Sequence, residues 1–325
     1  MALSSVPTAF SGNPLNRADH LREDPEIFGA YMEREDARVV LFAIEGERDE
    51  GNSSFLPPND YWVLTDEPGD IAWQKPSAIR LLPKDNTIFL GLDENGAPRF
   101  AVKLGGTTTD FAEFFEPQGQ KFRDGRNIAH KLTNPPSSPH PSLGIIAQAK
   151  SMLMWHDSHR FCAKCGEESE MIKAGYEREC PACKAHHFPR TDPVVIMLVR
   201  CGDKALVGRG KGWPEGNFSA LAGYMEPGES MEEAVAREVF EEVGLKTTHV
   251  RYVASQPWPW PSTLMIGVEA WVEDGEITLQ EAEIAEALWI TKDDVRASMK
   301  GESPYRLVPP PFAIAHNLVK NWMDE

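Results

Sequence analysis

Three glutamates crowd one short segment of the chain. Glu238, Glu241 and Glu242 fall within five residues, and the segment from Gly223 to Leu245 contains no lysine. Two carboxylates about 4 Å apart repel by roughly 4 kcal/mol at an effective dielectric constant of about 20. A divalent cation turns that repulsion into attraction, and carboxylate oxygens are ligands that suit Mg²⁺ and Mn²⁺. The spacing therefore predicts a magnesium or manganese site.

A helix is expected to carry these carboxylates. Ser230 followed by Glu233 forms a capping box, and Gly244 is typical of the position just after a helix. The predicted helix therefore spans residues 231–243. Two of the three glutamates then project from its apolar side, one helical turn apart. A solvated acidic helix would place its glutamates opposite the apolar side chains, so the pattern favours a metal site.

Four of the five cysteines form two CxxC pairs. The paired residues are Cys162, Cys165, Cys180 and Cys183. Each pair can place two thiolates on one turn, and two such turns close a tetrahedral Zn²⁺ site. All four positions would be filled by protein, so the zinc is expected to be structural. His186 and His187 stay open as alternative ligands, a redox role of the pairs is less favoured, and Cys201 is expected at a strand end.

The composition of the chain limits its class. It has 325 residues, of which 41% are hydrophobic, which is enough for two or three folded domains. Its net charge of −17 argues against general nucleic-acid binding. The longest apolar run, Val194–Val199, is far shorter than the roughly 20 residues that span a bilayer. The N-terminus does not have the pattern of a signal peptide, so we expect a cytoplasmic protein without a membrane partner.

Four consecutive regions are expected to position these groups. They are an N-terminal α+β domain (1–133), a linker and helix (134–155), a zinc ribbon (156–190) and a C-terminal α/β domain (191–325). In the first, Val39–Gly46 reads as a strand, and Asn95-Gly96 is expected to turn a hairpin. Apolar residues at helical spacing between 145 and 153 predict a helix that leads to the cysteines.

The glutamate segment resembles a known family. Its residues at the fixed positions of the Nudix box are Gly223, Glu229, Arg237, Glu238, Val239, Glu241, Glu242, Gly244 and Leu245. By this resemblance the chain is identified as a Nudix hydrolase, with its Nudix domain over 191–325. The resemblance implies an α/β/α sandwich, preceded here by the zinc ribbon and the N-terminal α+β domain. It also implies metal-dependent hydrolysis, by water, of a nucleoside diphosphate linked to another group.

The resemblance implies roles for single residues. The expected metal ligands are Ala222, through its carbonyl, and Glu238, Glu241, Glu242 and Glu283. The expected catalytic residues are Glu238, Glu241 and Glu242, with Glu241 favoured as the acceptor of the proton from water. Glu229 and Arg237 are expected to form a salt bridge within the box. Glu283 belongs to a later acidic cluster, in which it is favoured over Glu286.

A second segment indicates a branch of the family. Residues 255–263 read SQPWPWPST and resemble the SQPWPFPxS element of NADH pyrophosphatases, with Trp260 where that branch has Phe. A four-cysteine zinc ribbon before the Nudix domain is characteristic of the same branch. The substrate contacts that the resemblance implies are Phe188, Tyr224, Gln256, Pro257, Trp258, Pro259, Trp260, Pro261, Ser262, Thr263 and Ala315.

The resemblance thus implies a homodimeric enzyme that hydrolyses the pyrophosphate bond of NADH, NAD and related dinucleotides to nicotinamide mononucleotide and AMP. Its cofactors would be catalytic Mg²⁺ or Mn²⁺ and structural Zn²⁺. Removal of NAD caps from RNA 5′ ends, by the same site, is the alternative. A zinc-ribbon binding module on an inactive Nudix scaffold is a third reading, for which the intact box gives no support. The N-terminal domain is expected to be a degenerate Nudix-like unit without chemistry of its own.

Overall fold

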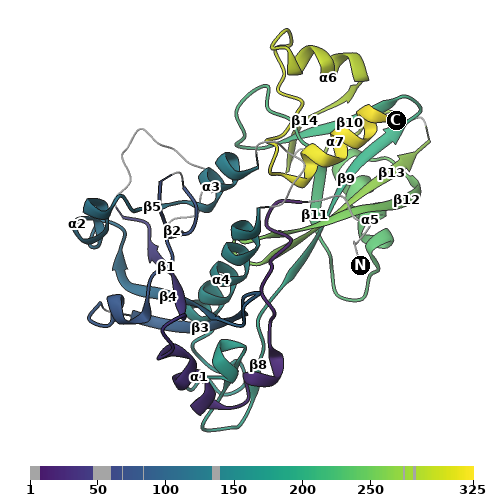
Figure 1. Cartoon of the computed structure of the whole chain (residues 1–325). Coiled ribbons are helices and arrows are strands. Elements are labelled where there is room, and N and C mark those ends of the chain that lie inside the picture. Colours follow the sequence, from purple (N-terminus) through teal and green to yellow (C-terminus); the bar gives the residue numbers. More distant parts are fainter. Residues whose placement is uncertain are drawn as a thin grey trace.

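The computed structural model describes residues 8–46, 60–67, 69–82, 84–133, 140–273, 275–280 and 283–325 (Figure 1). Most of the predicted linker, 134–139, lies outside the described residues. Among the helices of the described residues, none combines the length and the apolar character that a membrane span requires.

A five-stranded sheet forms the centre of the N-terminal unit. Its strands, in the order β3-β4-β1-β2-β5, are β3 (Lys84–Leu92), β4 (Pro98–Thr107), β1 (Arg38–Ile44), β2 (Tyr61–Thr65) and β5 (Lys121–Arg123). β1 and β4 are parallel, and the other neighbours are antiparallel. The predicted hairpin at Asn95-Gly96 is confirmed by β3 and β4, with Gly96 at a positive φ of 74°.

Both faces of this sheet are covered, which explains why β1 is almost continuously apolar. Val40 and Phe42 pack against the face that carries α3 (Gly125–Leu132) and α4 (Pro141–Ser158). Val39 and Leu41 pack toward α1 (Pro25–Met32) and α2 (Ala112–Phe115) on the other face. The short helices of this unit are η1 (Asp19–Leu21), η2 (Pro76–Ile79) and η3 (Glu116–Gln118).

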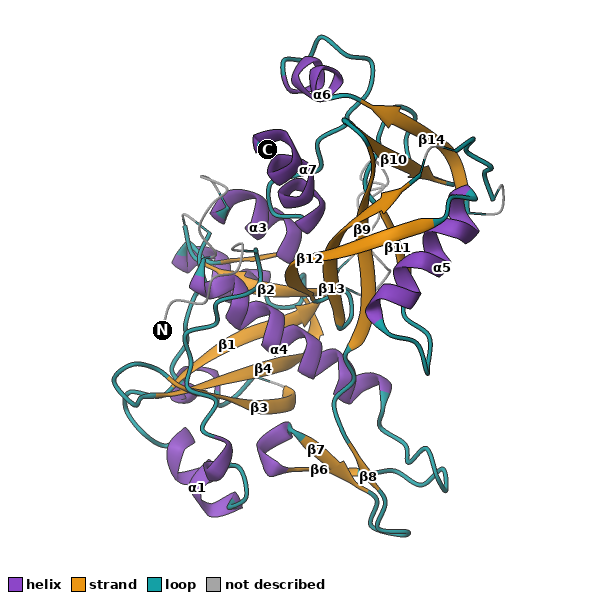
Figure 2. Cartoon of the chain, turned by 90° about the vertical axis from the view of Figure 1, so that its right-hand side faces the viewer, coloured by secondary structure: helices purple, strands orange, loops and turns teal. Residues whose placement is uncertain are grey.

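Helix α4 leads from this sheet to the small ribbon that holds the cysteines (Figure 2). Pro141 occupies its first turn, where a missing N–H costs no hydrogen bond. The ribbon consists of β6 (Glu170–Ile172), η4 (Lys173–Gly175), β7 (Glu177–Glu179) and β8 (His186–His187), with antiparallel pairing throughout.

The C-terminal unit is a six-stranded mixed sheet between helices. Its strands are β12 (Thr247–Trp258), β13 (Thr263–Val272), β9 (Asp192–Cys201), β10 (Lys204–Gly210) and β14 (Ile284–Ile290), in that order, with β11 (Leu221–Tyr224) paired to β9. Val195 and Met197 of β9 pack toward α5 (Met231–Val243), and Ile196 and Leu198 pack toward α7 (Ile314–Asp324). This is the predicted α/β/α sandwich, with α5 and α7 on opposite faces and α6 (Lys292–Met299) beyond β14 (Figure 2).

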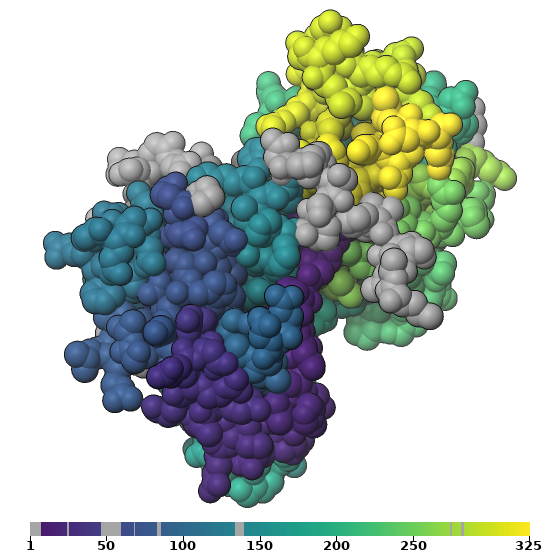
Figure 3. Space-filling view, viewed as in Figure 1, coloured from purple at the N-terminus to yellow at the C-terminus, as the bar shows by residue number. Residues whose placement is uncertain are grey.

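The two units appear as two lobes in the space-filling view (Figure 3). They meet at the segment of residues 255–263. Thr8 Oγ1 donates to the carbonyl of Ser255 at 2.8 Å, and Ser151 Oγ donates to the carbonyl of Pro261 at 3.0 Å. The N-terminal unit therefore contacts the segment that the sequence assigns to substrate binding.

Candidate active site

The predicted helix of the glutamate segment is confirmed at both ends. Ser230 Oγ accepts from the N–H of Glu233 at 3.3 Å, and Glu233 Oε2 accepts from the N–H of Ser230 at 2.7 Å. The helix ends at Gly244, which adopts the left-handed conformation with φ 73°. These local contacts fix the direction in which the carboxylates of α5 project.

Arg237 organises the carboxylates of the box. Its guanidinium donates to both oxygens of Glu229, at 3.0 and 2.7 Å, and to the carbonyl of Tyr224 at 2.9 Å. It also donates to Glu238 Oε1 at 2.7 Å and to Glu241 Oε2 at 3.0 Å. The hydrogen bonds to Glu229 are the main reason that the pKa of Arg237 is raised above its ordinary value. The loop before α5 is thereby held to the helix.

Glu242 has a buried carboxylate oxygen without a hydrogen-bond partner among the described residues. The residue is only 5% exposed. Burial, and then the carboxylates of Glu238 and Glu283, raise the pKa of Glu242 to about 8. An unpaired buried carboxylate oxygen is costly unless a cation or donor meets it, so this atom fits a divalent cation.

Gly223 leaves room for the carboxylate of Glu238. A Cβ at position 223 would lie 1.9 Å from Cδ of Glu238, so the carboxylate of Glu238 would have to move. Burial raises the pKa of Glu238, and its hydrogen bond from Arg237 opposes that shift. The glycine of the box is therefore explained by the close approach of the Glu238 side chain to the backbone of β11.

The four expected carboxylates do not converge on one point. Among the described residues, only the cysteines bring three or more candidate ligand atoms within 4.8 Å of one another. Two of the glutamates, Glu238 and Glu241, are instead bonded to Arg237. Glu242 and Glu283 line a common cavity, where the peptide of Glu283 accepts from the N–H of Lys211 at 2.9 Å.

That cavity, which we call the inner cavity, has a volume of about 380 Å³. Six of the residues that the sequence predicts for the site line it: Ala222, Glu242, Gln256, Trp258, Glu283 and Ala315. Its volume lies near the lower end of the range of about 300–1,000 Å³ that is usual for ligand pockets. Trp258 forms part of its wall and stacks on Phe312, with centroids 6.1 Å apart and an interplanar angle of 13°.

Gln256 uses its side-chain amide to hold neighbouring backbone in place. Its Nε2 donates to the carbonyls of Ala9, at 3.1 Å, and Phe312, at 2.7 Å. Its Oε1 accepts from the N–H of Ile314 at 2.8 Å. Although Gln256 lines the inner cavity, its two donors are therefore bonded to protein. The residue positions the start of α7, where Ala315 lies.

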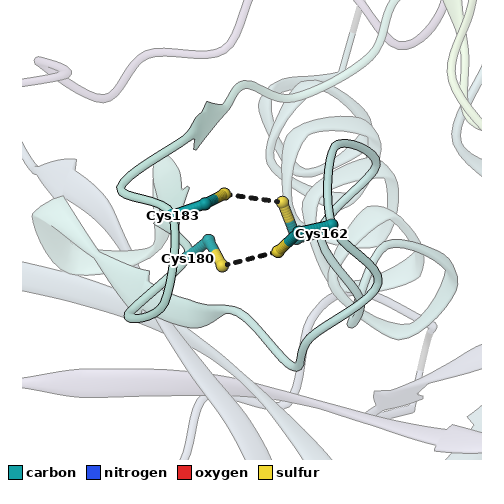
Figure 4. Close-up of side chains that lie close together, drawn as sticks. Cys162, Cys180 and Cys183 are labelled. Atoms are coloured by element: carbon teal, nitrogen blue, oxygen red, sulfur yellow. Dashed lines mark hydrogen bonds between the residues drawn. The ribbon is translucent and has the colours of Figure 1, made fainter.

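The four cysteines meet at the end of the ribbon. Cys162 Sγ lies 3.6 Å from Cys183 Sγ, and Cys165 Sγ lies 3.5 Å from Cys180 Sγ (Figure 4). A tetrahedron with Zn–S bonds of about 2.3 Å has edges of about 3.8 Å, so the thiols are spaced as zinc ligands. Of the two alternative ligands, His187 Nε2 lies 3.3 Å from Cys162 Sγ, whereas His186 bonds to Glu177.

Comparison with known proteins agrees with this architecture. Three family profiles match consecutive parts of the chain: the NADH pyrophosphatase-like rudimentary NUDIX domain over residues 36–155, the NADH pyrophosphatase zinc ribbon domain over 157–188 and the NUDIX domain over 189–309. Mouse "NAD(P)H pyrophosphatase NUDT13, mitochondrial" is 36% identical over 259 residues, which cover 74% of this chain and 72% of that protein. The chain belongs to the NADH pyrophosphatase branch of the Nudix family.

Two further Nudix relatives are named for a different activity. Human "NAD-capped RNA hydrolase NUDT12" is 47% identical over 191 residues, which cover 55% of this chain and 41% of that protein. "NAD-capped RNA hydrolase NudC" of Mycobacterium bovis is 42% identical over 186 residues, which cover 55% of this chain and 59% of that protein. The match thus spans less than half of the length of the human relative.

The remaining predicted contacts of this Nudix protein fall into separate groups. Phe188 and Tyr224 are 67% and 59% exposed and line neither the inner cavity nor a second cavity of about 550 Å³ where the two units meet. Pro257, Ser262 and Thr263 line that second cavity, together with the other side of Trp258. Pro259 is buried, and Pro261 is exposed.

Trp260 anchors the Nudix domain to the N-terminal unit. It is 8% exposed, and its Nε1 donates to Asp60 Oδ2 at 3.0 Å. Lys150 Nζ lies 2.5 Å from Asp60 Oδ1 and 4.3 Å from the centroid of the Trp260 indole. Sequence reasoning missed Asp60 and Lys150. The available signal was that Lys150 is the only charged residue between Pro141 and Trp155 of a mostly apolar helix.

Proposed function

We propose that the protein hydrolyses the pyrophosphate bond of NADH, NAD and related dinucleotides to nicotinamide mononucleotide and AMP. The observation that carries this proposal is the unpaired buried oxygen of Glu242, on a cavity wall shared with Glu283, Trp258 and Ala222. The complete Nudix box and the activity for which mouse NUDT13 is named support the same reaction.

The residues of the box fit a divalent cation. Glu238, Glu241, Glu242, Glu283 and the carbonyl of Ala222 would hold Mg²⁺ or Mn²⁺, because the donors are all oxygens. When bound, these cations neutralise charge on the pyrophosphate and lower the pKa of the attacking water. The zinc ribbon would hold Zn²⁺ as a structural ion.

The chain's own side chains orient the reactants and move the proton. The water oxygen forms a bond to one phosphorus, the bridging P–O bond breaks, and the bridging oxygen leaves with the other mononucleotide. We assign to Glu241 the acceptance of the proton from water, because its carboxylate is half exposed and is oriented by Arg237. Trp258, backed by Phe312, offers a flat apolar face for a base. Phe188 and Tyr224 stay proposed stacking residues.

A product assay tests this function. NADH, NAD, ADP-ribose and diadenosine diphosphate are incubated with the protein and Mg²⁺, Mn²⁺ or a chelator. The products are separated and identified by mass spectrometry. We expect mononucleotides from NADH and NAD, formed only with a divalent cation. Reaction in ¹⁸O water identifies the phosphorus that is attacked. Absence of mononucleotides from every dinucleotide with either metal rejects the proposal.

NAD-cap removal from RNA is a second candidate function, because two relatives of at least 42% identity are named for that activity. The net charge of −17 disfavours a long contact with RNA. Turnover of capped RNA and of NADH is therefore compared across salt concentrations. A capped-RNA rate that falls much more steeply with salt indicates phosphate contacts beyond the pyrophosphate.

A homodimer and a cytoplasmic location complete the proposal. Phe161 and Phe188, 62% and 67% exposed, put two large apolar side chains on the surface of the ribbon, as expected of a contact between chains. The four ribbon cysteines form no disulfide, which suits a reducing compartment. Light scattering after gel filtration measures the mass of the assembly, and a monomer at micromolar concentration contradicts the dimer.

A further inference from the structure

A third cavity opens beside the inner cavity. This outer cavity has a volume of about 360 Å³ and shares Trp213, Ser219 and Ala313 with the inner cavity. Its other walls come from the loop after β10 and from the segment before α7, and they include Pro214, Phe218, Arg306, Val308 and Pro309. The two cavities are therefore neighbouring compartments with a common wall.

Trp213 is the largest of the three residues in the common wall, and hydrogen bonds hold its backbone in place. The N–H of Trp213 donates to the carbonyl of Gly210 at 3.2 Å, and its own carbonyl accepts from Arg209 Nη1 at 3.3 Å. A Cβ at Gly210 would lie 3.5 Å from Trp213 Nε1, so the indole lies directly over this glycine. A flat, partly exposed indole between two compartments suits the stacking of a nucleobase.

Arg306 supplies positive charge to this cavity, whose other walls are uncharged. Its N–H donates to the carbonyl of Gly216 at 2.7 Å, and its carbonyl accepts from the N–H of Phe218 at 3.0 Å. These bonds fix the point from which the side chain projects. Within the part of the chain that the structure describes, the exposed guanidinium has neither an ion pair nor a side-chain hydrogen bond, although the net charge is −17. Arginine binds phosphate through paired hydrogen bonds.

Building on the proposed function, we propose that the outer cavity binds the adenosine end of the dinucleotide and that Arg306 contacts a second phosphate group on its ribose. A dinucleotide carries one nucleoside on each side of its pyrophosphate, so it needs a second compartment next to the one that contains Glu242 and Glu283. The inner cavity then takes the pyrophosphate and the nicotinamide end. A ribose phosphate of this kind has two sources: the 2′-phosphate of NADPH and the 3′-phosphodiester of NAD-capped RNA.

The experiment compares three substrates. The value of kcat/KM is measured for NADH, for NADPH and for NAD extended by one 3′-linked nucleotide, with the wild-type chain, Arg306→Gln and Arg306→Lys. The matched control is Arg296→Gln, whose arginine lies on α6 and pairs with Asp293 at 2.6 Å. The readout is the kcat/KM for each phosphate-bearing substrate divided by the kcat/KM for NADH. This ratio cancels a general change in activity.

We expect Arg306→Gln to lower at least one of these ratios about tenfold or more, the effect of losing a charge-assisted hydrogen bond. Arg306→Lys should retain part of the ratio, and Arg296→Gln should retain all of it. A fall confined to NADPH assigns the site to the 2′-phosphate, and a fall confined to the extended substrate assigns it to the 3′-phosphodiester.

Two outcomes overturn the inference while leaving the proposed function intact. One is hydrolysis of NADH with both ratios unchanged in Arg306→Gln. The other is a wild-type preference for NADH of more than about a hundredfold over both phosphate-bearing substrates, which corresponds to about 2.7 kcal/mol against the extra phosphate. A wild-type chain that hydrolyses none of the three substrates instead contradicts the proposed function itself.

Discussion

Glu241 differs from Glu238 and Glu242 because its side chain is 51% exposed, whereas those two residues are buried. We expect Glu241→Gln to lower kcat on NADH by a factor of about 10²–10⁴, since it removes the proton acceptor and keeps the shape of the side chain. The free energy of unfolding should change by less than about 0.5 kcal/mol. Steady-state kinetics and urea unfolding measure the two effects. Glu232→Gln, in the first turn of the same helix, is the control, and full activity of Glu241→Gln refutes the assignment.

Gly223 provides a second test at the scale of single residues. The methyl group of Gly223→Ala would meet the carboxyl group of Glu238 at 1.9 Å. We expect the carboxylate to be displaced, with a loss of activity of at least tenfold and a destabilisation of about 1–3 kcal/mol. Gly29→Ala is the control, because no atom lies within 4 Å of its added Cβ. Wild-type kinetics in Gly223→Ala would show that this contact is unimportant.

At the scale of elements, predictability depended on how local the signals were. The ends of α5 could be predicted to the residue, because the Ser230–Glu233 capping box and the left-handed Gly244 lie beside the helix they limit. The course of α4 could also be predicted, but its surroundings could not. Helical periodicity does not indicate that Lys150 and His156 are completely buried, because their partners come from distant elements.

His156 joins α4 to the ribbon through a neutral imidazole. Its Nδ1 accepts from Arg178 Nη1 at 3.0 Å, so Nε2 carries the proton that it donates to the carbonyl of Gly175 at 2.8 Å. Burial is the main cause that lowers the pKa of His156 to about 4, and the Arg178 guanidinium adds to it. In the unfolded chain the histidine pKa is about 6.5, so as the pH falls the unfolded chain takes up a second proton on this imidazole before the folded chain does.

The stability contributed by neutral His156 is therefore present above about pH 6.5 and is lost as the pH falls toward about 4. We expect this residue alone to account for a decrease of about 3 kcal/mol in the free energy of unfolding across that interval. Urea unfolding at a series of pH values measures it. His156→Gln should flatten the curve relative to wild type, and His20→Gln, at an exposed position, should not. Equal slopes in all three chains would contradict the assignment.

At the scale of the whole molecule, the Asp60–Lys150 pair holds the two units together through Trp260. Both side chains are fully buried, and burial lowers the pKa of Lys150 to about 8. We expect Lys150→Met to cost about 3–5 kcal/mol, because it leaves a buried carboxylate without its partner. KM for NADH should rise as well, since Trp260 adjoins Trp258 with centroids 4.9 Å apart.

Denaturant unfolding and steady-state kinetics of Lys150→Met measure these effects. In the double variant with Asp60→Asn, most of the lost stability should return, because the isolated charge has gone. The exposed Lys246→Met serves as the matched control. A cost of less than about 1 kcal/mol in the single variant would show that the pair contributes little.

The roles of Gln256 and Trp260 could not be predicted from the sequence, because their partners lie far away along the chain. Both belong to a segment that resembles a substrate-binding element, yet Gln256 bonds to Ala9 across 247 positions, and Trp260 bonds to Asp60 across 200. The motif places the segment in the molecule, whereas contacts across domains decide which of its side chains face the cavity. A sequence pattern carries no record of such pairings.

The anchoring of Trp260 also bears on how a truncated form of this protein would behave. A fragment that begins at β9 would keep the box and every proposed metal ligand. It would lose the contact of Trp260 with Asp60, which would expose the indole, and the hydrogen bond of Gln256 to Ala9. We expect such a fragment to aggregate or to hydrolyse dinucleotides slowly. Its low activity could then be wrongly attributed to the loss of a catalytic residue. The N-terminal unit, which has no reaction of its own, would then be needed to keep residues 255–263 of the Nudix domain in their active conformation.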